Sequence, residues 1–536
     1  MDDMLERWRR GDTSLVWQHC CSFLDLSLEE FVAIQRHKWK EQMACLCESE
    51  LGRRIVGDKP PRDLDEFRER VPFTTYDDYE PFLSQKREDV LPGKPYTWAR
   101  SSGVGGRVKW IPLTREMYDV AIDSLFAAVL LSTAMGRGVF SLRCNDIMFC
   151  GVAPPPWGSG VAFFGIIEKY GLRSVPTLEQ VRSIDNMGLR AIVGFRGALR
   201  NGLQVMPALP SVLVAVGDSF ETAARSSLNP RQPATAMRIV RGLLRSRIAG
   251  RAMLPRDVWN LKSVMAFGAD LQAFEGRIAG QWGKKPHDMY VNVEFAGPFA
   301  MQTWTRDGMT PMPHVGLLEF IPEDEWSKSR EDPSYKPATV LLDGVRPNER
   351  YELVFTSFNG GVLVRYRPGD MIKVTALQDE AAGVKLPQMV FWSRADKLVN
   401  IGGFTRIDEK TLWLALEQGS VPYTGWIARK EGVEGQSVLH VYLETTAPSS
   451  ARENAEMSLH ENLKKLDVSY GDLETHLKMK PLRLTFLPPG TLAKYDVERQ
   501  AAGADAGHMK ELHMQPPEDA VRRILEIAAE CGEGAV

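Results

Sequence analysis

Between Val315 and Val374 the chain is a series of short strand-forming runs separated by turn residues, and this stretch constrains the fold most. The pattern predicts five strands: Gly316–Ile321, Ala338–Leu342, Tyr351–Ser357, Gly361–Arg367 and Met371–Val374. Helical spacing dominates the residues before it, notably 13–50 and Arg115–Met135, although strand candidates occur at Ile147–Val152 and near Ser263. A mixed α/β fold follows from this combination.

A chain of 536 residues is longer than one hydrophobic core usually serves, so two or more domains are expected. After Phe391 strands and helices alternate, and the pair Gly402-Gly403 is either a hinge or an ordinary turn. We place the boundary near Asp396. The expected domains are therefore residues 1–395 and 396–536.

Composition excludes several classes of protein. The formal net charge is −3, which gives no general attraction to nucleic acid or to an anionic membrane, although a local basic patch is compatible with it. No apolar run is long enough to span a membrane. The charged beginning, MDDMLERWRRGD, argues against a secretion signal, and seven cysteines without a C-x-x-C pair favour a reducing cytoplasm.

The loop Arg100-Ser-Ser-Gly-Val-Gly-Gly-Arg-Val-Lys109 has the composition of a phosphate-binding loop. Three glycines allow successive backbone N–H groups to point inward, and serine hydroxyls and Lys109 add donors for phosphate oxygens. The spacing matches neither the P-loop nor the dinucleotide fingerprint. Taken alone, the segment is more often an ordinary loop.

Four other features carry candidate chemistry. Glu294 follows a strand, where it suits Mg²⁺ or is only a surface glutamate. Asp370 follows a turn and could accept two hydrogen bonds from a ribose diol. Arg365 and Arg367 would share one face of a strand, where they meet phosphate, partner carboxylates or only water. Lys510 follows glycine-rich turns, and could reach an anionic centre or simply lie in water.

The order of these segments resembles the adenylate-forming superfamily and, more closely, the Gretchen Hagen family of acyl acid amido synthetases in its bacterial form. The markers are Phe320-Ile-Pro, Tyr351-Glu-Leu-Val, Val364-Arg-Tyr-Arg-Pro-Gly-Asp370, Gly403-Phe-Thr-Arg-Ile and Gly503-Ala-Asp-Ala-Gly-His-Met-Lys510. The resemblance implies a large N-terminal domain with a β-barrel and helix-flanked sheets, and a small mobile α/β C-terminal domain.

The resemblance also implies a reaction: a carboxylate attacks ATP to give acyl-AMP, and an amine, usually an amino acid, then forms an amide. The cofactors implied are ATP and Mg²⁺, with Glu294 as the metal ligand and Lys510, Glu294 and Lys109 as catalytic residues. Arg394 and Asp396 fall at the hinge. The implied nucleotide-binding residues are Ser101, Ser102, Gly103, Gly105, Gly106, Ala266, Phe267, Gly268, Tyr290, Asn292, Asp370 and Arg394. Pro156, Phe164, Phe295 and Phe299 are candidates for the acyl pocket.

The chain departs from the family pattern at neutral positions. Val104, Gly105 and Val293 stand where hydroxyl residues are usual, and His508 and Glu511 flank Lys510 where glutamine and proline are frequent. Each lost neutral hydrogen bond costs about 0.5–1.5 kcal/mol, yet the charged groups remain. An active amide-forming enzyme is therefore favoured. The alternatives are an acyl-CoA synthetase and a catalytically weakened nucleotide- or acyl-binding homologue.

Overall fold

The chain divides into two compact units, Met1–Trp392 and Ser393–Val536. A computed structural model describes residues 2–102, 108–228, 232–267, 271–332, 334–401, 405–419, 421–433, 436–467, 470–471, 481–501 and 512–533. Within these ranges no helix is long and apolar enough to cross a membrane.

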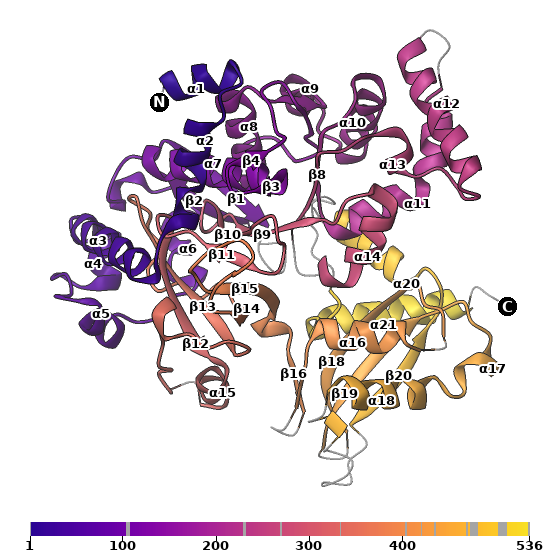
Figure 1. Cartoon of the computed structure of the whole chain (residues 1–536). Coiled ribbons are helices and arrows are strands. Elements are labelled where there is room, and N and C mark those ends of the chain that lie inside the picture. Colours follow the sequence, from indigo (N-terminus) through magenta and orange to yellow (C-terminus); the bar gives the residue numbers. More distant parts are fainter. Residues whose placement is uncertain are drawn as a thin grey trace. The chain divides into compact units, whose positions relative to one another are not determined.

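The first unit contains most of the helices and strands (Figure 1). Its helices are α1 (Asp2–Arg9), α2 (Ser14–Cys21), α3 (Leu28–Cys47), α4 (Glu50–Val56), α5 (Leu64–Arg70), α6 (Glu80–Leu83), α7 (Arg115–Ser132), α8 (Gly158–Tyr170), α9 (Leu178–Ser183), α10 (Met187–Asn201), α11 (Pro210–Ser226), α12 (Pro233–Ile248), α13 (Pro255–Val258), α14 (Leu271–Trp282) and α15 (Glu323–Glu331). Its strands are β1 (Thr97–Ser102), β2 (Val108–Leu113), β3 (Ala134–Gly136), β4 (Val139–Phe140), β5 (Ile147–Phe149), β6 (Arg173–Val175), β7 (Val205–Ala208), β8 (Ser263–Ala266), β9 (His287–Asn292), β10 (Gly297–Gln302), β11 (Met309–Pro311), β12 (Gly316–Pro322), β13 (Arg350–Ser357), β14 (Asp370–Ala376) and β15 (Gln388–Arg394), the last of which ends in the second unit.

An 11-stranded sheet runs through this unit in the order β12-β13-β14-β15-β11-β10-β9-β8-β7-β5-β6. The strands β5 to β9 pair in parallel, whereas β10 pairs antiparallel with both β9 and β11. The strands β12 to β15 lie at one end of this sheet. The mixed α/β fold is confirmed. The change from parallel to antiparallel pairing falls at β9 and β10, which carry several of the candidate residues.

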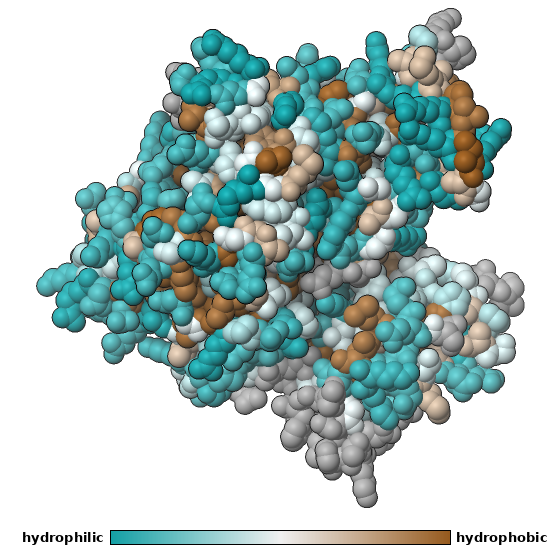
Figure 2. Space-filling model, in the orientation of Figure 1, coloured by the Kyte–Doolittle hydropathy of each residue, from teal (hydrophilic) through white to brown (hydrophobic). Residues whose placement is uncertain are grey.

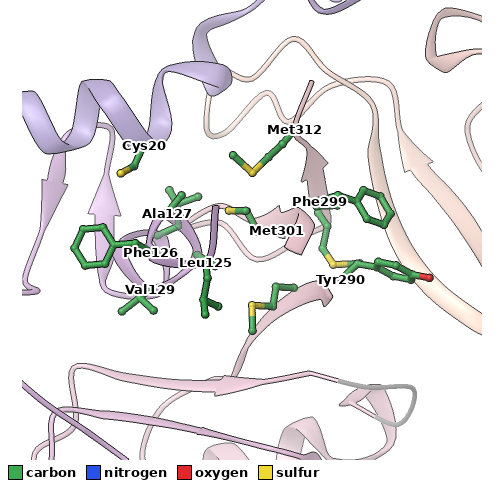
Figure 3. Close-up of a cluster of buried hydrophobic side chains, with 14 of the residues drawn as sticks. Cys20, Leu125, Phe126, Ala127, Val129, Tyr290, Phe299, Met301 and Met312 are labelled. Carbon is green, nitrogen blue, oxygen red and sulfur yellow. The ribbon is translucent and has the colours of Figure 1, made fainter. Parts of the chain in front are cut away.

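The helix α7 shows how the sequence sets this packing. Thr114 caps it by accepting a hydrogen bond from the backbone N–H of Met117, and Ser124 to Ser132 form a buried run. A helix that is apolar over so much of its surface must be covered on several sides. It packs against β10 and α8, as Figure 1 shows. Figure 3 shows Leu125 and Phe126 of α7 in the same core as Phe299 and Met301 of β10.

Two of the five expected strands are absent as ladders from the described residues, and both predictions are wrong. Val340 forms a single bridge with Phe320, after which the chain turns into a 3-10 helix. In the segment 361–367 only Tyr366 forms bridges, because Arg365 takes a left-handed φ of 42° that interrupts the extended chain.

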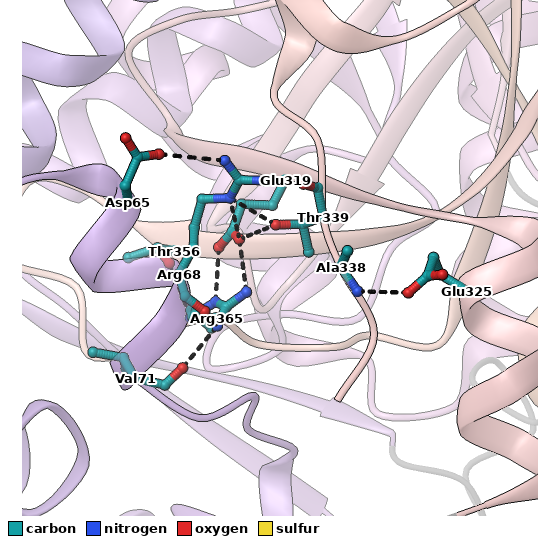
Figure 4. A network of polar contacts seen from close by, with 9 residues as sticks. All are labelled: Asp65, Arg68, Val71, Glu319, Glu325, Ala338, Thr339, Thr356 and Arg365. Carbon is teal, nitrogen blue, oxygen red and sulfur yellow. Dashed lines mark hydrogen bonds and ion pairs between the residues drawn. The ribbon is translucent and has the colours of Figure 1, made fainter. Parts of the chain in front are cut away.

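The expectation for Arg365 and Arg367 resolves in favour of partner carboxylates. Arg365 is buried, and its guanidinium donates to both oxygens of Glu319 at 3.1 and 2.9 Å. It also donates to the backbone carbonyls of Arg68 and Val71, as Figure 4 shows. Arg367 forms its own ion pair with Glu352. The two arginines therefore fix the segment that leads to Asp370, and do not form a solvated basic face.

The second unit is a separate α/β fold with its own core. Its sheet has the order β18-β19-β20, with β18 and β19 antiparallel and β19 and β20 parallel. Its elements are β16 (Val399–Ile401), β17 (Thr405–Ile407), α16 (Glu409–Glu417), β18 (Gly425–Val433), β19 (Gln436–Glu444), α17 (Ser449–Arg452), α18 (Ala455–Leu466), β20 (Leu482–Leu487), α20 (Thr491–Ala501) and α21 (Glu518–Glu533).

Candidate active site

The expected phosphate loop joins the two strands of a hairpin. β1 and β2 pair antiparallel, with Ser101 opposite Lys109 and Ser102 opposite Val108. The expected loop residues Gly103, Gly105 and Gly106 lie outside the described residues, as does the side chain of Ser102. The register places Ser101 and Lys109 at the base of the loop, on neighbouring strands.

The base of this hairpin is attached to the segment that precedes α8. The backbone N–H of Arg100 donates to the carbonyl of Pro156 at 2.8 Å, and the Arg100 guanidinium lies 4.0 Å from the centre of the Trp157 ring. Pro156, a candidate for the acyl pocket, thus holds β1 through its backbone carbonyl.

Lys109 and Glu294 form an ion pair although they are far apart in sequence. The ammonium of Lys109 donates to Glu294 Oε1 at 2.8 Å and to the hydroxyl of Tyr366 at 3.0 Å. Glu294 is only 9% exposed and lies in the turn between β9 and β10. The structure therefore joins the expected phosphate-loop lysine and the expected metal ligand in one partly buried cluster, where screening by water is reduced.

Tyr290 and Asp370 form a second pair, and each is four residues along the chain from a member of the first cluster, Tyr290 from Glu294 and Asp370 from Tyr366. Tyr290 lies on β9, and its hydroxyl donates to a carboxylate oxygen of Asp370, the first residue of β14. Both residues are buried. Gly369, with a φ of 76°, supplies the left-handed turn that starts β14, a conformation that glycine adopts without strain. The residues expected beside adenine and ribose are thus in direct contact.

A cluster of aromatic rings lies behind Tyr290. The Tyr290 ring centre is 4.6 Å from that of Phe299, and Phe295 lies 5.0 Å from Phe299 and 3.9 Å from Phe355. Figure 3 shows Tyr290 and Phe299 side by side in this core. Phe295 and Phe299 are buried, so these two acyl-pocket candidates are core side chains that pack against Tyr290.

The remaining candidates on the first unit have packing roles that the structure describes. Phe164, the fourth acyl-pocket candidate, belongs to the buried core, and the Arg182 guanidinium lies 4.8 Å from its ring centre. Asn292 accepts a hydrogen bond from the backbone N–H of Phe295 at 2.9 Å and so closes the turn that holds Glu294.

The expected adenine-side loop follows β8. Ala266 is completely buried at the end of that strand, opposite Asp288 of β9, and Phe267 packs against the main core. Gly268 lies outside the described residues. The carboxyl end of β8 is thus next to the strand that carries Tyr290, an arrangement typical of ligand sites in parallel sheets.

The other candidates belong to the second unit. Arg394 ends β15, and Asp396 lies in the following 3-10 helix, Ala395–Lys397, although the Asp396 side chain is not among those described. Lys510 falls in residues 502–511, outside the described residues. Its catalytic role stays a prediction.

Sequence reasoning missed two tyrosines of the site. Tyr366 accepts from Lys109, and the Lys109 ammonium also lies 5.4 Å from the centre of the Tyr76 ring. The Tyr76 hydroxyl accepts from the backbone N–H of Trp110 at 2.7 Å. Burial raises the pKa of Tyr76 above its usual value. Tyr366 lies within the marker that ends at Asp370, so its position was a usable signal. Nothing near Tyr76 in the sequence points to Lys109.

Comparison with known proteins gives these pairs a context. Residues 20–153 match the GH3 family N-terminal domain, and residues 309–394 match the GH3 family central domain. The chain carries GH3 family domains. GH3 is the Gretchen Hagen family, so the resemblance noted from the sequence is confirmed, whereas the bacterial form stays a prediction.

The curated relatives are plant proteins. The chain is 37% identical over 113 residues to indole-3-acetic acid-amido synthetase GH3.8 of Oryza sativa subsp. indica, and 31% identical over 104 residues to GH3.17 of Arabidopsis thaliana. The first match covers 21% of this chain, the second 17%, and each covers 16% of its relative. The alignments therefore span about a sixth of the relatives' length.

Solved structures extend the similarity of fold to nearly the whole chain. The GH3.15 acyl acid amido synthetase in complex with 2,4-DB aligns with a TM-score of 0.66 at 16% identity, over 95% of each chain. A 2-hydroxyisobutyryl-CoA ligase in the postadenylation state aligns with a TM-score of 0.55 at 14% identity, over 99% of this chain and 92% of the ligase. These similarities show that the chain shares the fold of these two enzymes over nearly its whole length.

Proposed function

We propose that the chain uses ATP to activate a small carboxylic acid and then transfers the acyl group to an amine, most simply an amino acid. A carboxylate oxygen attacks the α-phosphorus of ATP, the bond to the β-phosphate breaks, and pyrophosphate leaves. The amine nitrogen then attacks the acyl carbon, AMP leaves, and the amine loses a proton to water. The ion pair between Lys109 and Glu294, together with the pair of Tyr290 and Asp370, is the observation that carries this proposal.

The chemistry of these groups fits ATP. Lys109 supplies a mobile positive charge for phosphate oxygens, and the Asp370 carboxylate suits a ribose diol. Tyr290, by donating to Asp370, fixes the orientation of that carboxylate. In the absence of nucleotide Lys109 and Glu294 neutralise each other, and the phosphates would draw Lys109 toward the loop.

Glu294 also fits Mg²⁺. This ion is usually held by one or two protein carboxylates together with substrate phosphates, so a single buried glutamate beside the phosphate loop is a sufficient protein contribution. When bound, the ion would neutralise charge on the phosphates as the carboxylate approaches. The role of Lys510 in stabilising the charge that develops during adenylation belongs to the same proposal.

Val293 accounts for one of the missing hydroxyl groups. A Cβ atom added to Gly158, at the start of α8, would lie 2.4 Å from a methyl group of Val293, so the valine packs directly on that glycine. In place of the usual hydroxyl residue, this chain has a valine that packs the turn of Glu294 against the start of α8. The charged groups of the site are unaffected by this exchange, which supports an active enzyme.

The decisive assay is pyrophosphate release across a panel of carboxylic acids. Lys109→Met, which removes the charge and keeps the length of the side chain, is expected to lower kcat/KM at least ~100-fold. Lys86→Met is the matched control, because it makes the same exchange at another lysine. The Lys86 ammonium lies 3.5 Å from the centre of the Trp110 ring. The control should retain parental activity. The proposal fails if no acid stimulates release, or if Lys109→Met equals the parent.

Product analysis separates the alternatives. Mass spectrometry after incubation with amino acids should detect an amide, whereas a thioester formed only with coenzyme A would establish an acyl-CoA synthetase. ATP binding by calorimetry without turnover of any acid would instead indicate a nucleotide-binding homologue.

A further inference from the structure

Helix α12 carries an apolar stripe that faces solvent. Met237, Val240, Leu244 and Ile248 have exposed fractions of 72%, 50%, 57% and 88%. Their spacing of three and four residues places them on one side of a helix. Figure 2 shows this stripe as a brown band along α12 at the upper right of the view. We call these four side chains the α12 stripe.

The stripe is not the surface by which α12 packs on its own unit. The buried residues of the helix are Thr235, Ile239, Gly242 and Ser246. At about 100° per residue they lie opposite the α12 stripe. Gly242 allows close packing, since an added Cβ would lie 2.7 Å from Met253 Sδ and 2.8 Å from a Val258 methyl group. The helix therefore packs on its own unit through a face of mostly small residues, and the α12 stripe on the opposite face stays exposed.

Positive charge borders the stripe on both sides. The helix contains four arginines and no Asp or Glu between residues 233 and 248. Arg241 and Arg247 are exposed on opposite borders of the stripe, and within the described residues neither forms a salt bridge. Arg238 and Arg245 donate to backbone carbonyls and keep their charge. The exposed surface of α12 is thus apolar along its centre and cationic at its margins.

We propose that α12 is a docking surface for an anionic lipid membrane. A helix with an apolar stripe between arginines lies in the plane of a bilayer interface, with the apolar side chains at the headgroup–acyl boundary and the guanidinium groups on anionic headgroups. The α12 stripe spans about 16 Å along the helix axis at 1.5 Å per residue, which suits such shallow insertion. This goes beyond the proposed acyl transfer and does not depend on it.

Charge complementarity selects this partner over a second copy of the chain. Two α12 helices packed stripe to stripe would bring Arg241 and Arg247 of one copy against arginines of the other, and like charges oppose that contact. The formal net charge of −3 predicts no attraction to anionic membranes, but it averages over the whole chain. The local charge of α12 is positive.

Sedimentation with lipid vesicles tests the proposal on the full chain. The parent should bind phosphatidylcholine vesicles that contain phosphatidylserine, bind less as salt is raised, and not bind phosphatidylcholine alone. The double variant Leu244→Ser, Ile248→Ser should lower the partition coefficient ~10-fold or more, and Arg241→Glu with Arg247→Glu at least as much. Because all four side chains are exposed, the variants should unfold like the parent.

Met457→Ser is the matched control, because this methionine is also exposed, at 63%, but lies on α18 of the second unit. It should bind vesicles like the parent. The proposal is overturned if the parent binds no vesicle, if it binds neutral vesicles equally well, or if the stripe variants match the parent. A dimer in solution that Leu244→Ser, Ile248→Ser dissociates, without vesicle binding, would make α12 an interface between copies. Binding to an acidic protein alone would likewise refute it.

Discussion

The buried ion pair between Glu319 and Arg365 is expected to control both stability and the site. Their side chains are 1% and 4% exposed. Arg365 immediately precedes Tyr366, which accepts a hydrogen bond from Lys109. Glu319→Gln leaves Arg365 buried without a counter-ion, and breaking a buried pair in this way costs about 3–5 kcal/mol. Arg365→Met leaves Glu319 with the guanidinium of Arg68, whose Nε lies 3.9 Å from a carboxylate oxygen. We therefore expect Glu319→Gln to lower the free energy of unfolding by this amount, and Arg365→Met to lower it by about 3 kcal/mol, the lower end of the range.

The double variant Glu319→Leu, Arg365→Met should lose much less than the sum of its singles. Both charges are then absent, and the remaining loss is three hydrogen bonds. The Thr339 hydroxyl loses its acceptor Glu319, and the backbone carbonyls of Arg68 and Val71 lose their donor Arg365. At about 1 kcal/mol for each lost hydrogen bond, the double variant should lose about 3 kcal/mol.

Urea unfolding of four proteins measures the coupling energy between the two side chains. The four are the parent, Glu319→Leu, Arg365→Met and the double variant. Glu6→Gln is the control, because its ion pair with Arg10 is exposed and should contribute nothing measurable. Additive losses in the cycle would refute the electrostatic argument, as would a single variant as stable as the parent. A single variant that folds should also raise KM for ATP, since Tyr366 loses its anchor.

Three further predictions concern single contacts. Tyr290→Phe removes the hydroxyl that donates to Asp370. It should raise KM for ATP ~10-fold or more, with a smaller effect on kcat, as measured by pyrophosphate release. An unchanged KM would show that this hydroxyl does not orient Asp370. Gly158→Ala should lower the free energy of unfolding by about 1–3 kcal/mol, because the new Cβ atom meets Val293. Adding Val293→Ala should recover this stability, as measured by thermal unfolding. If the stability is not recovered, the clash with Val293 is not the cause. Burial raises the pKa of Asp288 from 3.8 to about 7. The free energy of unfolding should therefore fall as pH rises from about 4 to 7, by ~1.4 kcal/mol for each unit by which the pKa is displaced. Asp288→Asn should flatten this pH dependence, and a pH profile identical to that of the parent would contradict the prediction.

The sequence predicts much of the fold because local patterns and the core agree. The apolar run in Arg115–Met135 becomes α7, and the run from Tyr351 becomes β13, since both are buried over most of their residues. The failures are equally physical. The apolar residues of Gly361–Arg367 are buried, but the left-handed turn at Arg365 and its bond to Glu319 override the strand pattern. No periodicity reports such a long-range ion pair.

The site was predictable by residue type but not by contact. A carboxylate after a turn and a lysine after glycines indicate chemistry at Asp370 and Lys109 separately. That Lys109 contacts Glu294 depends on how β2 and the turn after β9 are positioned, which local sequence does not encode. Acyl-pocket residues are harder still, because an apolar side chain that lines a pocket and one that fills a core look alike in sequence.

The two residue pairs of the site can come together only when the first unit is correctly folded. Lys109 and Glu294 are 185 residues apart, and Tyr290 and Asp370 are 80 apart, so no short fragment of the chain holds all four groups together. Contacts between such distant residues form only when the intervening chain is in place. A ligand that touches both pairs would bind the native state alone, and at 100 times its Kd it would add about 2.7 kcal/mol to the stability of that state. Substrate supply and the lifetime of the folded protein would then be linked.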